Sequence, residues 1–284
     1  MPEIAGYNLH SIETGQFALD GGSMFGIVPK VMWETRFTPD NKNRIPMHMR
    51  CLLLEGHGQL ILIDNGIGDK YTEKFGSMFA IDHSEMNLSN SLKKLGFNFS
   101  DITDVILTHL HFDHCGGSTV RSGDSLNIAF PDATFHVQKD HWDWACMSNV
   151  REKASFLSEN LDPLGESGQL RLIEGDTQLF PGVELICVDG HTKSMQLVKL
   201  QDDQRTLLFA ADLLPTSAHL PPPWNMSYDL WPMITIEEKA RILEQAVTEN
   251  WTIFFEHDAH TAIAEVSASE RGPGILNPRT LSEL

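Results

Sequence analysis

Short apolar runs alternate with polar, turn-forming stretches along the whole chain. The runs are rich in Leu, Ile, Val and Phe and span few residues, which is typical of buried β-strands. Two stretches favour helices: Ser84–Leu95, which ends before Gly96, and Ile236–Asn250, which is acidic at its start. Helices interleaved with short strands predict an α/β (α+β) fold in which helices cover sheets. The predicted strands are Met49–Glu55, Gln59–Asp64, Asp104–Thr108, Ala133–Val137, Val183–Val188, Met195–Leu200, Thr206–Ala211 and Trp251–Glu256.

Two segments of the chain repeat one plan. CLLLEGHGQLILID is predicted as a strand, a polar turn and a strand ending in Asp64, and MQLVKLQDDQRTLLFAAD has the same order and ends in Asp212. Because hairpins are common, the similarity can be coincidental; alternatively, two related halves deliver carboxylates to a shared edge. No low-complexity linker separates the halves, and the proline-rich stretch Leu220–Trp224 is predicted as a rigid loop. We therefore expect one domain over residues 1–284.

The composition limits the classes of protein to which the chain can belong. The chain has 284 residues, 41% of them hydrophobic, which is enough for a substantial core. Lys and Arg total 21 against 39 Asp and Glu, giving a formal net charge of −18. A chain this acidic is not expected to bind nucleic acid or an anionic membrane through general electrostatics.

Targeting signals and a disulfide framework are not expected. The N-terminal residues lack a basic region followed by an apolar run, and no segment approaches the roughly 18 apolar residues of a membrane span. Cys51, Cys115, Cys146 and Cys187 are scattered, without a CxxC pair. These features favour a cytoplasmic enzyme in a reducing environment.

Residues 108–117, THLHFDHCGG, place three histidines and an aspartate directly after an apolar strand. His109 and His111 are two positions apart, so in an extended chain they point to the same side. Asp113 and His114 follow as the chain turns and can face a second point a few ångströms away. The pattern H-x-H-x-D-H therefore predicts a metal site, the alternative being a polar loop with incidental histidines.

Three further potential ligands each follow a different predicted strand. His191 comes after ELICVDG, Asp212 ends TLLFAAD, and His257 comes after WTIFFE. A single histidine at a strand end is more often structural than a ligand. Three such residues together with the H-x-H-x-D-H cluster indicate a shared cleft, because the carboxyl ends of strands present groups to one edge of a sheet.

This combination resembles the metallo-β-lactamase superfamily from about Met49 to His257. The resemblance implies an αβ/βα four-layer sandwich in which two central β-sheets are flanked by helices. It also implies that Asp64 is the aspartate that orients the loop carrying the ligand histidines. In the implied dinuclear centre, one metal is held by His109, His111 and His191, the other by Asp113, His114 and His257, and Asp212 bridges them.

The ligand types limit the identity of the two divalent ions. Imidazole and carboxylate suit Zn²⁺, which we take as the first expectation, and they also suit Mn²⁺, Fe²⁺ or Co²⁺. No cysteine stands at a ligand position, which argues against a β-lactamase that uses a cysteine ligand.

Three further stretches of the sequence indicate which branch of the superfamily the chain resembles. GGSMFGIVPKVMWETR, at residues 21–36, and PDNKNRIPMHMRCLLLE look like the quorum-quenching lactonase branch that includes the YtnP-like hydrolases, as does ADLLPTSAHLPPPWNMSYDLWP. The branch implies ring opening of N-acyl-homoserine lactones, in which a hydroxide bridging the metals attacks the carbonyl. Asp113 would then accept the attacking proton and pass it to the leaving alkoxide.

Several apolar and aromatic residues are candidates for the substrate pocket. Residues 1–46 are interpreted as an N-terminal extension that contributes to this pocket or to a homodimer contact. Ordinary packing is the alternative for each candidate. The candidates are Met24, Phe25, Val28 and Trp33 in the extension and His219, Trp224 and Tyr228 after Asp212.

Two positions depart from the resemblance. Related lactonases carry a tyrosine three residues after the bridging aspartate, where this chain has Pro215. That role would be vacant or filled by Tyr228 or His219. Lys193 replaces the proline that usually follows the third histidine, which changes the local turn without removing a ligand.

Other functions of the same superfamily remain open. A methyl parathion hydrolase-like phosphotriesterase would use the same metals and a similar pocket, so only assays distinguish it. A glyoxalase II-like thioesterase needs basic residues near the C-terminus, where this chain offers only Arg271 and Arg279. A flavodiiron-type protein needs an acidic ligand in its first motif and a flavin module, and a nuclease usually has a basic surface. A non-catalytic metal-binding module would be expected to have lost ligands, whereas all seven are present.

Overall fold

The computed structural model describes residues 1–147, 149–269 and 272–284, so Arg271 lies outside the described residues. Two seven-stranded mixed sheets form the centre of the molecule, and a separate hairpin is formed by β6 (Thr119–Ser122) and β7 (Ser125–Ile128). The first sheet has the order β1-β2-β3-β4-β5-β8-β9, with β1 Glu3–Ile4, β2 Tyr7–Asp20, β3 Arg44–Gly56, β4 Gln59–Ile63, β5 Asp104–Ile106, β8 Thr134–Gln138 and β9 Leu170–Ile173. The second sheet has the order β10 to β16, with β10 Thr177–Phe180, β11 Val183–Val188, β12 Met195–Gln201, β13 Thr206–Phe209, β14 Thr252–Phe254, β15 Ile263–Ser267 and β16 Gly274–Arg279.

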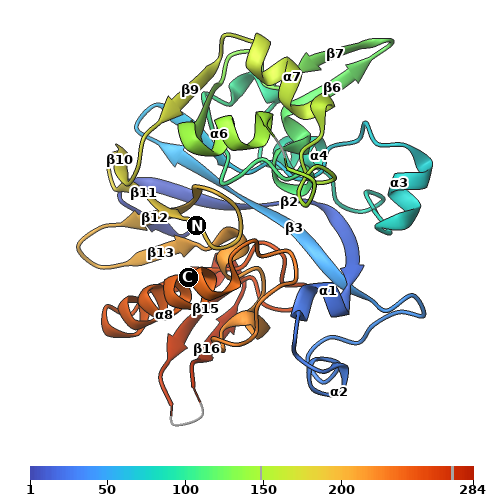
Figure 1. The fold of residues 1–284 in the computed structure, drawn as a ribbon. Helices are drawn as coiled ribbons and strands as arrows, with labels where there is room; N and C mark the ends of the chain where they lie inside the picture. The colour runs from blue at the N-terminus through green and yellow to red at the C-terminus, as the bar shows by residue number, and fades with distance from the viewer. Residues whose placement is uncertain (148, 270–271) are drawn as a thin grey trace.

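Helices cover the outer faces of both sheets (Figure 1). On the first sheet, α4 (Leu88–Lys94), α6 (Lys139–Cys146) and α7 (Ser158–Glu166) enclose one apolar cluster. On the second sheet, α8 (Pro232–Thr248) buries Ile242, Leu243 and Ala246. The cluster that contains these α8 residues also contains buried residues of both sheets. The predicted fold with two sheets between helical layers is confirmed. The remaining helices are α1 Gly21–Phe25, α2 Lys30–Trp33, α3 Glu73–Met78 and α5 Phe112–Cys115.

The two halves share a topology. β3 and β4 form an antiparallel hairpin, and β5 pairs with β4 in parallel. In the second sheet, β12 and β13 form the antiparallel hairpin, and β14 pairs with β13 in parallel. The repeated plan in the sequence therefore corresponds to the same local architecture in each sheet.

Several predicted boundaries and elements differ from the structure. The helix expected from residue 84 begins at Leu88, because the Asn87 side chain caps it by accepting a hydrogen bond from the Asn90 amide at 2.9 Å. The helix expected at Ile236 already begins at Pro232, which suits a first helical position. β2 was not expected, since its polar residues and a bulge near Gly15, whose φ is 142°, break the alternation.

The N-terminal region belongs to this architecture. β2 pairs with β3 over most of its length, so the segment before residue 46 supplies two strands of the first sheet. α1 and α2 follow β2 and pack in a third apolar cluster next to the cavity described below. Within the described residues, no helix is both long and apolar enough to cross a lipid bilayer.

Candidate metal centre

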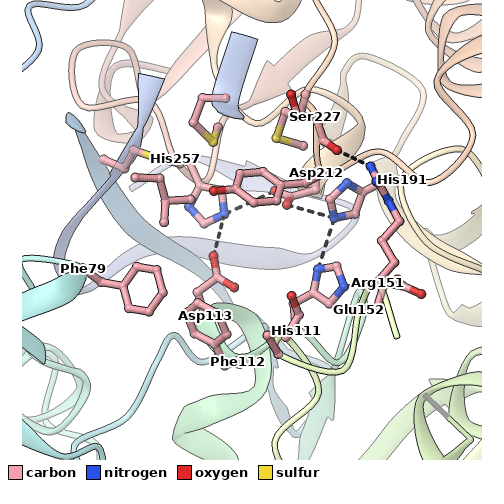
Figure 2. A pocket seen from close by; sticks show the side chains of 17 residues that line it. Phe79, His111, Phe112, Asp113, Arg151, Glu152, His191, Asp212, Ser227 and His257 are labelled. Atoms are coloured by element: carbon pink, nitrogen blue, oxygen red, sulfur yellow. Dashed lines mark hydrogen bonds and ion pairs between the residues drawn. The ribbon is translucent and has the colours of Figure 1, made fainter. Parts of the chain in front are cut away.

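Strand ends from both sheets meet at one edge of the molecule. The segment after β5 carries His109, His111, Asp113 and His114, while His191, Asp212 and His257 come shortly after β11, β13 and β14. The structure therefore brings all seven predicted ligands together, and all are buried. Figure 2 shows five of these side chains, those of His111, Asp113, His191, Asp212 and His257, facing one another.

The ligand atoms form two groups. In the first, His109, His111, His191 and Asp212 each offer one atom, and these atoms all lie within 4.8 Å of one another. The second group contains Asp113, His114 and His257 and meets the same limit. This division matches the one that the resemblance implied.

Asp212 lies between the two groups. Its Oδ2 is 3.2 Å from His191 Nε2 and 3.9 Å from His109 Nε2. Its Oδ1 is 3.3 Å from His257 Nε2 and 3.6 Å from His114 Nε2. Each carboxylate oxygen therefore faces one group, which is the geometry that a bridging ligand requires.

Buried polar atoms without partners indicate that these residues fit metal ions. Among the described residues, His109 Nε2 and Asp212 Oδ1 have no hydrogen-bond partner although both are buried. Such atoms are costly unless something else binds them. Burial would raise the pKa of Asp212, but the positive charges of His114, His191 and His257 hold it well below its usual range. An ionised carboxylate among imidazole nitrogens is a suitable donor set for divalent transition metals.

The turns that deliver the ligands require close backbone packing. The Gly-Gly pair at residues 116–117 follows the histidine cluster, and a Cβ at Gly116 would lie 2.2 Å from the Ile67 carbonyl oxygen. Non-glycine residues also have left-handed backbone conformations at the strand ends: Asp64 has a φ of 54° and Ala211 a φ of 43°. Strained conformations of this kind persist where the surrounding structure fixes them, commonly at functional sites.

Asp64 contacts the segment that carries the predicted histidine ligands. Its Oδ1 accepts a hydrogen bond from the Thr108 amide at 2.7 Å, and its Oδ2 accepts one from the Thr108 hydroxyl at 2.6 Å. The same Oδ2 lies 3.1 Å from His114 Nδ1, and the Thr108 hydroxyl lies 3.1 Å from His109 Nδ1. One carboxylate thus supports a ligand of each group.

Three carboxylates next to the ligands were not predicted. Asp229 Oδ1 lies 3.0 Å from His191 Nδ1, Glu152 Oε1 lies 3.5 Å from His111 Nε2, and Glu256 Oε2 lies 3.1 Å from His114 Nδ1. Burial raises the pKa of Glu256 to about 8. For Glu152, burial is outweighed by hydrogen bonding to His111, Thr192 and Trp144, which lowers its pKa to about 2. Of the three, only Glu256 had a sequence signal, since it directly precedes His257.

The sequence profile described as "Metallo-beta-lactamase superfamily" matches residues 50–267. The chain belongs to the metallo-β-lactamase superfamily.

Relatives within this superfamily include lactonases. The "N-acyl homoserine lactonase AiiA" of Bacillus thuringiensis subsp. kurstaki is 26% identical over 261 residues, covering 88% of this chain and 92% of that protein. A "probable metal-dependent hydrolase" from Staphylococcus aureus has a similar structure, with a TM-score of 0.89 and 27% identity over the whole of both chains. AidC, "a Dizinc Quorum-Quenching Lactonase", matches with a TM-score of 0.81 and 20% identity over 99% of this chain and 97% of its own, which shows the shared fold. Together with the site, the superfamily supports a metal-dependent hydrolase.

A cavity of about 320 Å³ opens over these clustered residues. Its lining includes the predicted ligands His111, Asp113, His191, Asp212 and His257. Apolar residues line the cavity as well, and Figure 2 shows Phe79 and Phe112 next to Asp113, with Arg151 and Glu152 toward His191. The apolar residues of the lining are Leu19, Met24, Met47, Phe79, Phe112, Ala154 and Met226.

The structure separates the seven candidate pocket residues. Met24 and Tyr228 line the cavity, whereas Val28 and Trp224 are not part of its lining. Phe25, Trp33 and His219 lie behind its wall instead: the Phe25 ring stacks on Trp33 at 5.5 Å and on His219 at 4.8 Å. Both nitrogens of His219 are engaged, with Nδ1 2.8 Å from the Thr216 hydroxyl and Nε2 donating to the Met24 carbonyl at 2.8 Å. The expected substrate contact of these three residues is therefore corrected to support of the wall.

Proposed function

We propose that this chain is a dinuclear metal-dependent lactonase that opens the ring of N-acyl-homoserine lactones. The observation that carries the proposal is the carboxylate of Asp212, whose two oxygens face two complete ligand groups at the floor of a largely apolar cavity. The relatives named as N-acyl homoserine lactonases favour the lactone over other esters. Divalent ions at such a site lower the pKa of water and polarise a carbonyl oxygen.

The residues of the chain have separate roles in this proposal. Asp113 moves the proton: its Oδ2 lies 3.8 Å from both His114 Nε2 and His257 Nε2, which leaves Oδ1 to accept a proton and return it to the leaving oxygen. The apolar wall around Phe79, Phe112 and Met24 holds the acyl chain and excludes water from it.

Tyr228 takes the place of the tyrosine that is missing at Pro215. It lines the cavity, and its side chain is 38% exposed. Burial and the negative charge of Asp113 raise its pKa, so its hydroxyl stays protonated and can donate a hydrogen bond to the substrate. His219, the alternative, has no free nitrogen for this role.

The decisive experiment uses purified protein of known metal content. Proton release is followed on short- and long-chain N-acyl-homoserine lactones, with a phosphotriester and a thioester in parallel. We expect rapid ring opening that stops when a chelator removes the metal. Turnover of the phosphotriester or thioester without lactone hydrolysis would instead assign the same metal centre to another substrate class.

A further inference from the structure

Glu152 is a buried carboxylate on a segment that is otherwise largely exposed. Its neighbours Arg151, Lys153 and Ala154 are exposed, whereas Glu152 itself is 4% exposed. The segment connects α6 to α7 and forms part of the cavity wall through Ala154 and Ser155. Burying a charge is unfavourable unless donors surround it, so the side chain needs a specific reason to point inward.

Three hydrogen-bond donors and a ring nitrogen of His111 surround this carboxylate. The Thr192 hydroxyl donates to Oε1 at 2.6 Å, and His111 Nε2 lies 3.5 Å from the same oxygen. Trp144 Nε1 donates to Oε2 at 2.6 Å, and Asn149 Nδ2 donates to it at 2.9 Å. Two of these partners are His111 and the residue that directly follows His191. The other two belong to α6 and the segment of Glu152 itself.

We propose that Glu152 is a positioning residue for the metal that His109, His111 and His191 would hold. It keeps the His111 ring with Nδ1 toward the ion, and it fixes the turn that carries His191. The orientation of His111 supports this, because its Nδ1 is 3.2 Å from His191 Nε2 while its Nε2 faces Glu152. If the His111 ring were rotated by 180° about its Cβ–Cγ bond, carbon atoms would face His191 and Glu152 in place of the two nitrogens. Carboxylates that accept a hydrogen bond from the second nitrogen of a ligand histidine fix its orientation and strengthen metal binding. This inference rests on the dinuclear site of the proposed function.

The partners also explain why a carboxylate is required at this position. Trp144, Asn149 and Thr192 donate to the two oxygens of Glu152, and His111 Nε2 faces Oε1, so both oxygens are placed as acceptors. Glutamine has nearly the same shape, but its amide nitrogen would face a donor on one side or the other. Glu152→Gln therefore removes the match of donors and acceptors without creating a large cavity.

The test measures metal binding rather than turnover. Metal-free protein is titrated with Zn²⁺ against a competing chelator, and metal per chain is measured after dialysis. In Glu152→Gln, we expect one of the two sites to weaken by about 10- to 100-fold while the other keeps its affinity. Asp229→Asn, which alters the partner of His191 Nδ1, should weaken one site in the same way. Glu166→Gln, at the exposed end of α7, is the matched control and should bind both ions like the wild type.

The alternative role of Glu152 is only to brace the cavity wall. In that case Glu152→Gln would lower the free energy of unfolding of the metal-free protein while both metal affinities of the folded protein stay unchanged, which would overturn the proposal. If the Glu152→Gln chain does not fold, Thr192→Val removes a single donor and should give a smaller loss of affinity at one site; two unchanged affinities in this variant would also overturn it. A wild-type protein that binds fewer than two ions would instead contradict the proposed dinuclear function.

Discussion

In the proposed function, the side chain of Asp113 has two roles, metal binding and proton transfer, which a single substitution can separate. An amide at this position keeps an oxygen for the metal but cannot carry a proton. For Asp113→Asn we expect kcat on the lactone to fall by about 100-fold or more, which is typical of losing a general base or acid. The measurement is steady-state kinetics on samples with equal metal content. Asp124→Asn, on the exposed turn of the β6–β7 hairpin, is the control. Full activity in Asp113→Asn would exclude it as the proton carrier.

The hydroxyl of Tyr228 gives a second prediction. In Tyr228→Phe, the ring that lines the cavity remains, so substrate binding changes little. Loss of a hydrogen bond to the reacting oxygen should lower kcat roughly tenfold, equivalent to about 1.4 kcal/mol. Kinetics that separate kcat from KM test this, since a purely packing role of the ring would leave both constants nearly unchanged in Tyr228→Phe.

At the level of single residues, the sequence indicated the candidate ligands that the structure brings together, but not the carboxylates that contact them. His109, His191 and Asp212 could be recognised because each stands in a short motif or directly after an apolar strand. Asp229 and Glu152 lie in irregular segments between helices, where no periodicity indicates the direction of a side chain. Their roles depend on contacts between residues 38 and 41 positions apart, which only the folded chain reveals.

Among the structural elements, α8 and the proline-rich loop are joined by a buried lysine. Lys239 on α8 donates hydrogen bonds to the carbonyl oxygens of Pro221 at 3.2 Å and Trp224 at 3.0 Å, and to Asn225 Oδ1 at 3.0 Å. The loop leads to Tyr228 in the cavity wall. The sequence correctly predicted a helix here, but not that a lysine would lie on its buried face, because helical periodicity places apolar residues there.

This lysine makes stability depend on pH. Burial lowers the pKa of Lys239 from 10.5 to about 7, with Asp229 acting in the opposite direction. Between these values the unfolded chain binds a proton that the folded chain has released, so the free energy of unfolding rises with pH. In Lys239→Met this rise should be lost from the window between pH 7 and 10. Denaturant unfolding of metal-free protein at several pH values measures it. Arg241→Met, an exposed cation on the same helix, should retain the wild-type slope.

For the whole molecule, the resemblance supplied what local patterns could not. Apolar runs indicated strands, but the pairing of β13 with β14 crosses the entire helix α8, and that of β5 with β8 crosses the β6–β7 hairpin. Pairings so distant in sequence depend on the packing of the two sheets against each other. The edge strands β1, β9, β10 and β16 also escaped prediction, since they are short or carry exposed polar residues.

The proposed metal centre lies between the two halves of the molecule, and this leads to a prediction for the whole fold. Four of the proposed ligands follow β5 of the first sheet and three follow strands of the second, so bound ions would connect the sheets at one edge. Ions present at roughly 1,000 times their dissociation constants stabilise the folded chain by about 4 kcal/mol per site. In a chain of this size about 1 kcal/mol of unfolding free energy corresponds to roughly 2 °C in Tm, so chelation should lower Tm by about 10 °C or more.

Asp212→Ala, which removes the ligand shared by both groups, should hold fewer than the roughly two ions of the wild type and respond less to the chelator. Thermal unfolding with metal analysis of the same samples measures both effects, and an unchanged Tm after complete metal removal would show that the ions do not connect the sheets.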